Sequence, residues 1–214
     1  MAQGETGEKI LHAAGILFAE RGFAETSLRT ITGMAEVNLA AVNYHFGSKK
    51  ELIQAVFTSI LGPFCKMLDS EITKLEADTA GGTPTVEQVL ICVSNALLKT
   101  PAETGVGVQR IMRLLSLAYT QSQEHLRKHL VANFGETYAR CSGLLQASVS
   151  GLTPVDFYWR LNYMLGAVIF TLSSYESLRA ILNSDYGQDS GLEDVLNSMI
   201  PSLAAILKAP SSKG

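Results

Sequence analysis

Apolar side chains recur along this chain three or four residues apart, almost from end to end. The first helix predicted by this spacing carries Ile10, Ala14, Leu17 and Phe18 on one face and ends at a glycine, as amphipathic helices often do. Turn-forming residues are sparse, and the densest run of them is ADTAGGTPT at 77–85. The pattern therefore predicts an all-α fold with one clear loop.

Capping residues divide the N-terminal part of the chain into short helices. Thr26 or Ser27 can cap a second helix, and Asn38 can cap a third that runs from residue 39 to residue 46. Ser48 can cap a fourth helix, with Glu51 three residues later in the spacing of a capping box. These signals predict a compact three-helix unit that leads directly into a longer helix.

The rest of the chain is predicted to form a larger helical body. The fourth helix meets Gly62-Pro63, where we expect a kink or a break because proline lacks a backbone N–H. Later helices are predicted at about 84–100, 105–120, 122–150, 153–183 and 191–208. The natural division is residues 1–50 and residues 51–214.

Composition narrows the class of protein by exclusion. The chain has 214 residues, 47% hydrophobic and 17% charged, which is typical of a globular protein. We find no apolar run of the roughly 18 residues that a membrane span needs and no secretory leader, so we expect no membrane partner. Three cysteines without CxxC spacing favour a reducing, cytoplasmic location, with no disulfide, metal or cofactor.

The third predicted helix has two faces of different chemistry. At about 100° per residue an apolar stripe would pack on the preceding helices, and it comprises Leu39, Val42 and Phe46. The opposite arc contains small and hydrogen-bonding side chains: Ala40, Ala41, Tyr44 and His45, with Asn43 at its border. Two short helices joined by a tight turn and braced by a third are typical of a helix-turn-helix, whose second helix enters the DNA major groove. Periodicity alone favours an ordinary amphipathic helix, because any such helix has one apolar and one polar face.

The charge of the chain bears on whether this helix could bind DNA. The formal net charge is −3, and residues 1–51 contain five basic and six acidic side chains. Bulk attraction to phosphates is therefore weak, and any DNA contact depends on where individual donors lie.

The run TSLRTITGMAEVNLAAVNYHFGSKKEL at 26–52, preceded by LFAERGF, resembles the N-terminal domain of the TetR family of transcriptional regulators. The resemblance covers about residues 8–56. It implies binding to a double-stranded DNA operator through the following residues: Thr26, Ser27, Arg29, Asn38, Leu39, Ala40, Ala41, Asn43, Tyr44, His45 and Lys49.

Three residues depart from the family pattern. Glu36 replaces the usual glycine in the turn between the second and third helices, where φ > 0 is often required and costs a non-glycine residue about 1 kcal/mol. Thr32 replaces the usual alanine. Asn43 replaces the usual tyrosine and would make a shorter contact with phosphate.

For the C-terminal part, the resemblance implies a homodimer formed through the last two long helices and a small effector bound in the helical core. Both predicted helices, 153–183 and 191–208, are rich in apolar residues, which an ordinary monomer core would also explain. In such a dimer, two helix-turn-helix units spaced one turn of the DNA helix apart would bind a near-palindromic operator. We further expect the effector to change the angle of the fourth helix and thereby the spacing of the two helix-turn-helix units.

The predicted effector is small and hydrophobic, such as a fatty acid or an acyl derivative. The candidate lining residues are Met112, Arg113, Leu115, Leu117, Tyr119, Trp159, Asn162, Tyr163 and Phe170. Arg110 or Arg113 could anchor an acidic headgroup, or could pair with an acid across an interface. The segments VNLAAVNYHFGSKKELI and GPFC also resemble the PsrA-like branch of the family, whose members sense long-chain fatty acids.

Catalysis is not expected. His125 and His129 are four residues apart, a spacing that suits either a metal or a solvated surface pair, and no third ligand is evident. Neither a nucleophile elbow nor a glycine-rich phosphate loop is present. The leading function is a ligand-responsive, non-enzymatic regulator, with repression as the commoner mode. The alternative is a helical small-molecule-binding or adaptor protein of the same fold with weakened DNA binding.

Overall fold

The computed structural model describes residues 2–121 and 123–210, and these form ten α-helices and no strand, which confirms the all-α prediction. The helices are α1 (Ala2–Glu25), α2 (Leu28–Ala35), α3 (Leu39–Phe46), α4 (Lys49–Asp78), α5 (Val86–Thr104), α6 (Val108–Thr120), α7 (Glu124–Ala147), α8 (Pro154–Ser173), α9 (Tyr175–Tyr186) and α10 (Leu192–Lys208). Ser122, within the helix predicted at 122–150, lies outside the described residues, as do residues 1 and 211–214.

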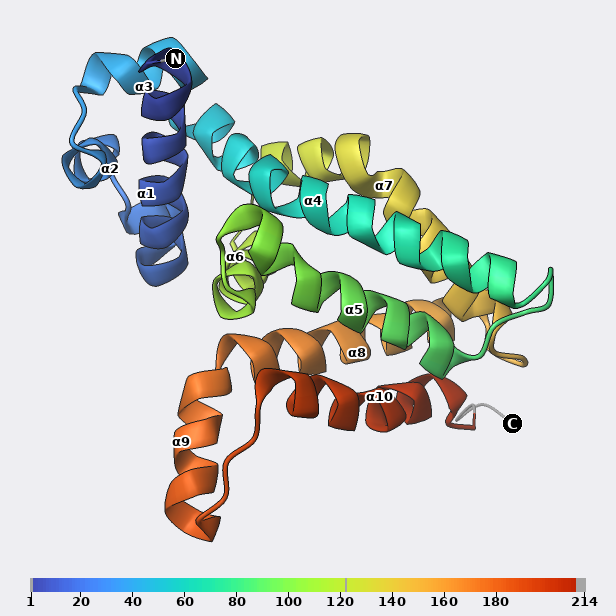
Figure 1. Ribbon diagram of the computed structural model, residues 1–214. Helices are drawn as coiled ribbons and strands as arrows, with labels where there is room; N and C mark the ends of the chain where they lie inside the picture. Colours follow the sequence, from blue (N-terminus) through green and yellow to red (C-terminus); the bar gives the residue numbers. More distant parts are fainter. Residues whose placement is uncertain (1, 122, 211–214) are drawn as a thin grey trace.

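Helices α1, α2 and α3 form a small unit at one end of the molecule (Figure 1). Its core contains Phe18, Ile31 and Val42, all fully buried. The ring of Phe23 meets that of Phe18 edge-on at 5.4 Å between centroids and lies 6.1 Å from that of Phe57 on α4. The apolar core of the small unit is therefore continuous with the larger helical body.

Helix α4 leads from the small unit into the body, where it lies beside α5 and α7 (Figure 1). Of the kink or break predicted at Gly62-Pro63, the break is wrong, because α4 is a single helix of 30 residues with Pro63 inside it. Burial of Ile60 and Leu68 on either side of the proline holds the helix together despite the lost hydrogen bond. In length and composition α4 resembles a membrane span, but the core helix of a soluble protein passes the same test.

The single helix predicted at 153–183 is in fact two helices, α8 and α9, bent by 70°. The bend falls at Ser174, which ends one helix and begins the next. Arg113 Nε of α6 donates to the carbonyl of Ser173 at 3.3 Å, and the Tyr175 hydroxyl donates to the carbonyl of Ser190 at 2.7 Å. These tertiary hydrogen bonds satisfy groups at the break, and sequence periodicity does not report them.

Candidate DNA-binding surface

Two side-chain caps fix the start of α2 and the start of α3. Ser27 Oγ accepts a hydrogen bond from the N–H of Thr30 at 3.0 Å, and Asn38 Oδ1 accepts one from the N–H of Ala41 at 2.9 Å. Each cap satisfies a backbone donor that would otherwise lack a partner in the first turn. The predicted caps at Ser27 and Asn38 are confirmed.

The turn between α2 and α3 has a left-handed residue at its centre. Glu36 has φ 55° and ψ 42°, which confirms the positive φ predicted there. The N–H of Glu36 donates to the carbonyl of Gly33 at 3.4 Å, and the N–H of Val37 donates to that of Thr32 at 3.0 Å. This pair of bonds is a Schellman motif, which normally has glycine at the left-handed position. The turn thus sets the angle of α3 at some cost in backbone strain.

Helix α3 buries one side and exposes the other. Val42 is fully buried and Phe46 is half-buried against the core, whereas Asn43 and Tyr44 are exposed, Tyr44 by 72%. The predicted packing of Leu39 in the buried stripe is wrong, because this side chain is 40% exposed at the start of the helix. Leu39 is the first residue of α3, so no preceding helical turn covers it.

The exposed face of α3 combines small and hydrogen-bonding side chains. Ala40 is exposed and Ala41 is half-buried, so the backbone can approach another surface closely. The rings of Tyr44 and His45 meet edge-on at 5.2 Å between centroids. His45 is half-buried, and its Nδ1 lies 3.6 Å from where a Cβ on Gly7 of α1 would stand. Helix α1 therefore limits the orientations available to the His45 ring.

Thr26 occupies a different environment from the other predicted contacts. It is fully buried, and its hydroxyl donates to the carbonyl of Gly22 at 2.8 Å or to that of Leu17 at 3.1 Å. Gly22 has φ 81° and ψ 169° and interrupts the helical geometry of α1. The predicted role of the Thr26 side chain in binding DNA is therefore corrected to that of closing the end of α1.

The junction between α3 and α4 brings cations next to α3. Ser48 Oγ accepts from the N–H of Glu51 at 3.2 Å, but the N–H of Ser48 donates to the carbonyl of Phe46 at 2.9 Å. Only half of the predicted capping box is therefore present. Lys49 is half-buried in the first turn of α4, and Lys50, which the prediction did not include, is exposed beside it.

The remaining predicted residues, Ser27 and Arg29, are exposed on α2 and its cap. The starts of α2, α3 and α4 place unpaired backbone N–H groups and positive helix-dipole ends where an anion can be bound. Together with the donors of α3, this surface suits a phosphate backbone flanking a groove.

The nine predicted effector residues lie in different environments. Met112 is buried in the core, whereas Arg113, Tyr119, Trp159, Tyr163 and Phe170 are exposed. The side-chain amide of Asn162 donates within α8, to the carbonyl of Tyr158 at 2.8 Å. Helix α8 is apolar on its outer as well as its inner side, and composition cannot distinguish them, so the effector pocket stays a prediction. Among the described residues, no group of three or more His, Cys, Asp or Glu could hold a metal.

The capped α2–turn–α3 unit, braced by α1 and followed by a helical body, defines a helix-turn-helix transcriptional regulator. The family described as "Bacterial regulatory proteins, tetR family" matches residues 10–56, and "Tetracyclin repressor-like, C-terminal domain" matches residues 92–205, more than half of the chain. The chain therefore belongs to the TetR family of transcriptional regulators, which are not enzymes.

Individual relatives agree with this membership. An HTH-type transcriptional repressor of Mycobacterium tuberculosis is 43% identical over 67 residues, which are 31% of this chain and 36% of that protein. The alignment thus spans about a third of this curated relative. A TetR-like regulator from Rhodococcus sp. RHA1 superimposes with a TM-score of 0.61 at 21% identity, over 93% of both chains. The regulator FadR from Bacillus subtilis, in complex with stearoyl-CoA, gives a TM-score of 0.51 at 16% identity, over 95% and 98% of the chains.

Proposed function

We propose that the protein is a cytoplasmic, dimeric repressor that binds a near-palindromic operator and is released by a small hydrophobic effector. Residues 1–50 would bind DNA, and residues 51–214 would dimerise and bind the effector. The observation that carries the proposal is the exposure of Asn43 and Tyr44 on a helix capped at both ends, beside Lys49 and Lys50. In the major groove these side chains would donate to phosphates and base edges.

Two outer helix faces support a dimer. Along α8 an exposed stripe is formed by large apolar side chains: Val155, Tyr158, Trp159, Tyr163 and Phe170. The exposed side of α10 carries small residues instead, among them Ser198, Ser202 and Ala205. Aromatic side chains of one subunit could pack over the small residues of the other, because small side chains allow helices to approach closely. We therefore assign Trp159, Tyr163 and Phe170 to the dimer interface in place of the effector pocket.

An acyl effector is supported by the apolar interior of the body. One buried cluster joins α4, α5, α8 and α10 and contains, among others, Leu68, Ile72, Phe157 and Met164. An acyl chain inserted among these side chains would gain roughly 0.8 kcal/mol for each buried methylene. The FadR regulator of similar fold was solved with stearoyl-CoA. Membership of the PsrA-like branch remains a prediction.

Release of DNA would follow from the continuity of α4. Its first turn adjoins α3, and its later turns pack in the body. An effector that prefers one angle of α4 would change the distance between the two α3 helices of the dimer. The free energy of operator binding could weaken by at most the difference between the effector's binding free energies for the two angles of α4.

A gel-shift experiment tests the proposal. The full chain is titrated onto DNA flanking its own gene, with and without palmitate or palmitoyl-CoA, at several salt concentrations. We expect a specific complex whose affinity falls steeply with salt, because phosphate contacts release counterions, and which the acyl compound dissociates. Failure to bind any flanking DNA would favour the adaptor alternative. Salt-sensitive binding that ignores both compounds would contradict the effector class alone.

A further inference from the structure

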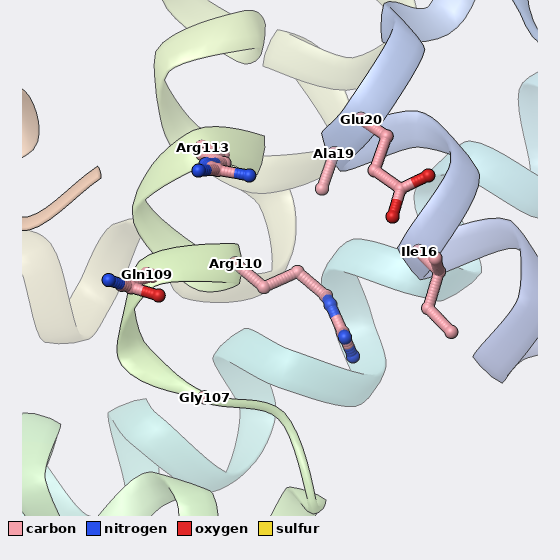
Figure 2. Close-up of a pocket in the computed structure, with 7 residues that line it drawn as sticks. All are labelled: Ile16, Ala19, Glu20, Gly107, Gln109, Arg110 and Arg113. Atoms are coloured by element: carbon pink, nitrogen blue, oxygen red, sulfur yellow. The ribbon is translucent and has the colours of Figure 1, made fainter. Parts of the chain in front are cut away.

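A crevice of about 180 Å³ lies between α1 and α6, at the junction of the α1–α3 unit and the helical body. Its lining consists of Ile16, Ala19, Glu20, Gly107, Gln109, Arg110 and Arg113. Figure 2 shows the Arg110 side chain extending from α6 toward α1, the Glu20 carboxylate extending from α1, and Arg113 lying over α6 one turn further along. We propose that this crevice is a binding site for a small oxyanion, a carboxylate or a phosphate group.

Both arginines have N–H donors that are not used in hydrogen bonds with the described residues. Within the described part of the chain, the guanidinium of half-buried Arg110 makes no hydrogen bond or ion pair, although it carries five N–H donors. Arg113 uses its Nε on the carbonyl of Ser173, which leaves its terminal nitrogens for a ligand. Planar guanidinium groups match the geometry of carboxylate and phosphate oxygens, and both arginines line this crevice.

The start of α6 adds backbone donors that also favour an anion. Helix α6 begins at Val108, and Gly107 at its N-cap position has no side chain to cap it, so its first N–H groups and its positive dipole end are available. The amide nitrogen of Gln109 is buried and has no acceptor within the described part of the chain. In Figure 2 this amide extends from α6 on the side away from α1, so it would not reach an anion held between α1 and α6.

Glu20 sets the charge of the preferred ligand. Among the described residues it forms no ion pair with either arginine, so the two cations are not neutralised across the gap. Two positive groups and one negative group favour a ligand with a single anionic group over a polyanion. A crevice of about 180 Å³ suits a small metabolite better than a long acyl chain. The site is therefore distinct from that of the proposed effector.

A ligand here would touch both parts of the protein. Outside the crevice, the C-terminal end of α6 already contacts α1, because Gln121 Oε1 accepts a hydrogen bond from the N–H of Phe23 at 3.3 Å. A bound oxyanion would add a second tie and hold α1 at a fixed angle to α6. We infer that it alters operator affinity, a consequence that rests on the proposed function.

Calorimetric titration of the full chain with inorganic phosphate and with acetate tests the site without DNA. We expect saturable binding of at least one of them, weakened at least tenfold by Arg110→Ala and strengthened about threefold by Glu20→Gln. Arg127→Ala, at an exposed arginine on α7, is the matched control and should bind as the wild type does. Arg113→Lys retains the charge but loses the planar fork, and should weaken binding severalfold.

Binding of phosphate alone, of acetate alone or of both would each support the site and identify its source chemistry, provided that Arg110→Ala weakens it. Absence of saturation, or equal binding by wild type and Arg110→Ala proteins with matching circular dichroism, would overturn it. Operator affinity is then measured with the binding anion and with chloride at equal ionic strength. A wild-type protein that binds operator without any response to the anion would overturn only the coupling.

Discussion

Among single residues, the one at the centre of the α2–α3 turn has the clearest energetic consequence. Glu36 has the left-handed backbone that glycine adopts freely, and its N–H and that of Val37 close the end of α2. The side chain is exposed, so little packing compensates for the strain. The turn therefore lowers stability where the position of α3 is set.

Replacing Glu36 by glycine should raise the free energy of unfolding by about 1 kcal/mol, because glycine lacks the steric penalty at positive φ. Urea denaturation measures the effect. Glu36→Ala is the control, since alanine removes the carboxylate but retains the penalty, and it should not stabilise. Equal stabilisation by both variants would assign the effect to charge.

The residue-scale chemistry was partly visible in the sequence. Ser27 and Asn38 were predictable as caps because cap chemistry is local. Burial of Thr26 and exposure of Leu39 were not, because both depend on how α1 packs against α2 and α3. Whether each exposed side chain contacts DNA stays a prediction.

At the scale of helices, α4 is anchored to α5 by one acidic side chain. Glu71 Oε1 accepts from Lys74 Nζ at 2.9 Å and from Lys99 Nζ at 3.0 Å, and Oε2 accepts from Asn95 at 3.2 Å. These bonds, with that of Lys74 the largest contribution, lower the pKa of Glu71 to about 2. The ionised carboxylate is thus favoured by folding.

Stability should depend on Glu71 in acid. Because its pKa is lower in the folded state than the ordinary 4.5, the contribution is fully present above pH 4.5 and is lost as pH falls toward 2. Allowing for screening, we expect a loss of about 2 kcal/mol. Denaturation at several pH values should show a shallower acid dependence in Glu71→Gln. Glu124→Gln, which removes an exposed pair with Lys128, should match the wild type.

Helix existence was easier to predict than helix continuity. Amphipathic spacing located the helical segments, but it allowed a break at Gly62-Pro63 that is absent and missed the bend at Ser174. Both outcomes are decided by tertiary contacts, namely burial around the proline and the hydrogen bond from Arg113 to Ser173. The exposure of several predicted effector residues was missed for a related reason, since two apolar faces of α8 have the same composition.

At the scale of the whole molecule, the α8 stripe should control assembly. Tyr163→Asp would bury a charge at the centre of the proposed interface and should weaken the dimer by at least about 2 kcal/mol, roughly thirtyfold. Light scattering coupled to size-exclusion chromatography gives the mass. Val131→Asp, at an exposed apolar position on α7, is the control and should remain dimeric. A Tyr163→Asp protein that stays fully dimeric would place the interface elsewhere.

The central claim is that α3 reads DNA, and fluorescence anisotropy with labelled operator DNA tests it most directly on two matched tyrosine variants. Tyr44 on α3 and Tyr186 at the end of α9 are 72% and 74% exposed, so loss of either ring should affect folding little. We expect Tyr44→Ala to weaken operator binding at least tenfold, while Tyr186→Ala binds as the wild type does. Equal affinity of Tyr44→Ala and wild type would contradict the claim.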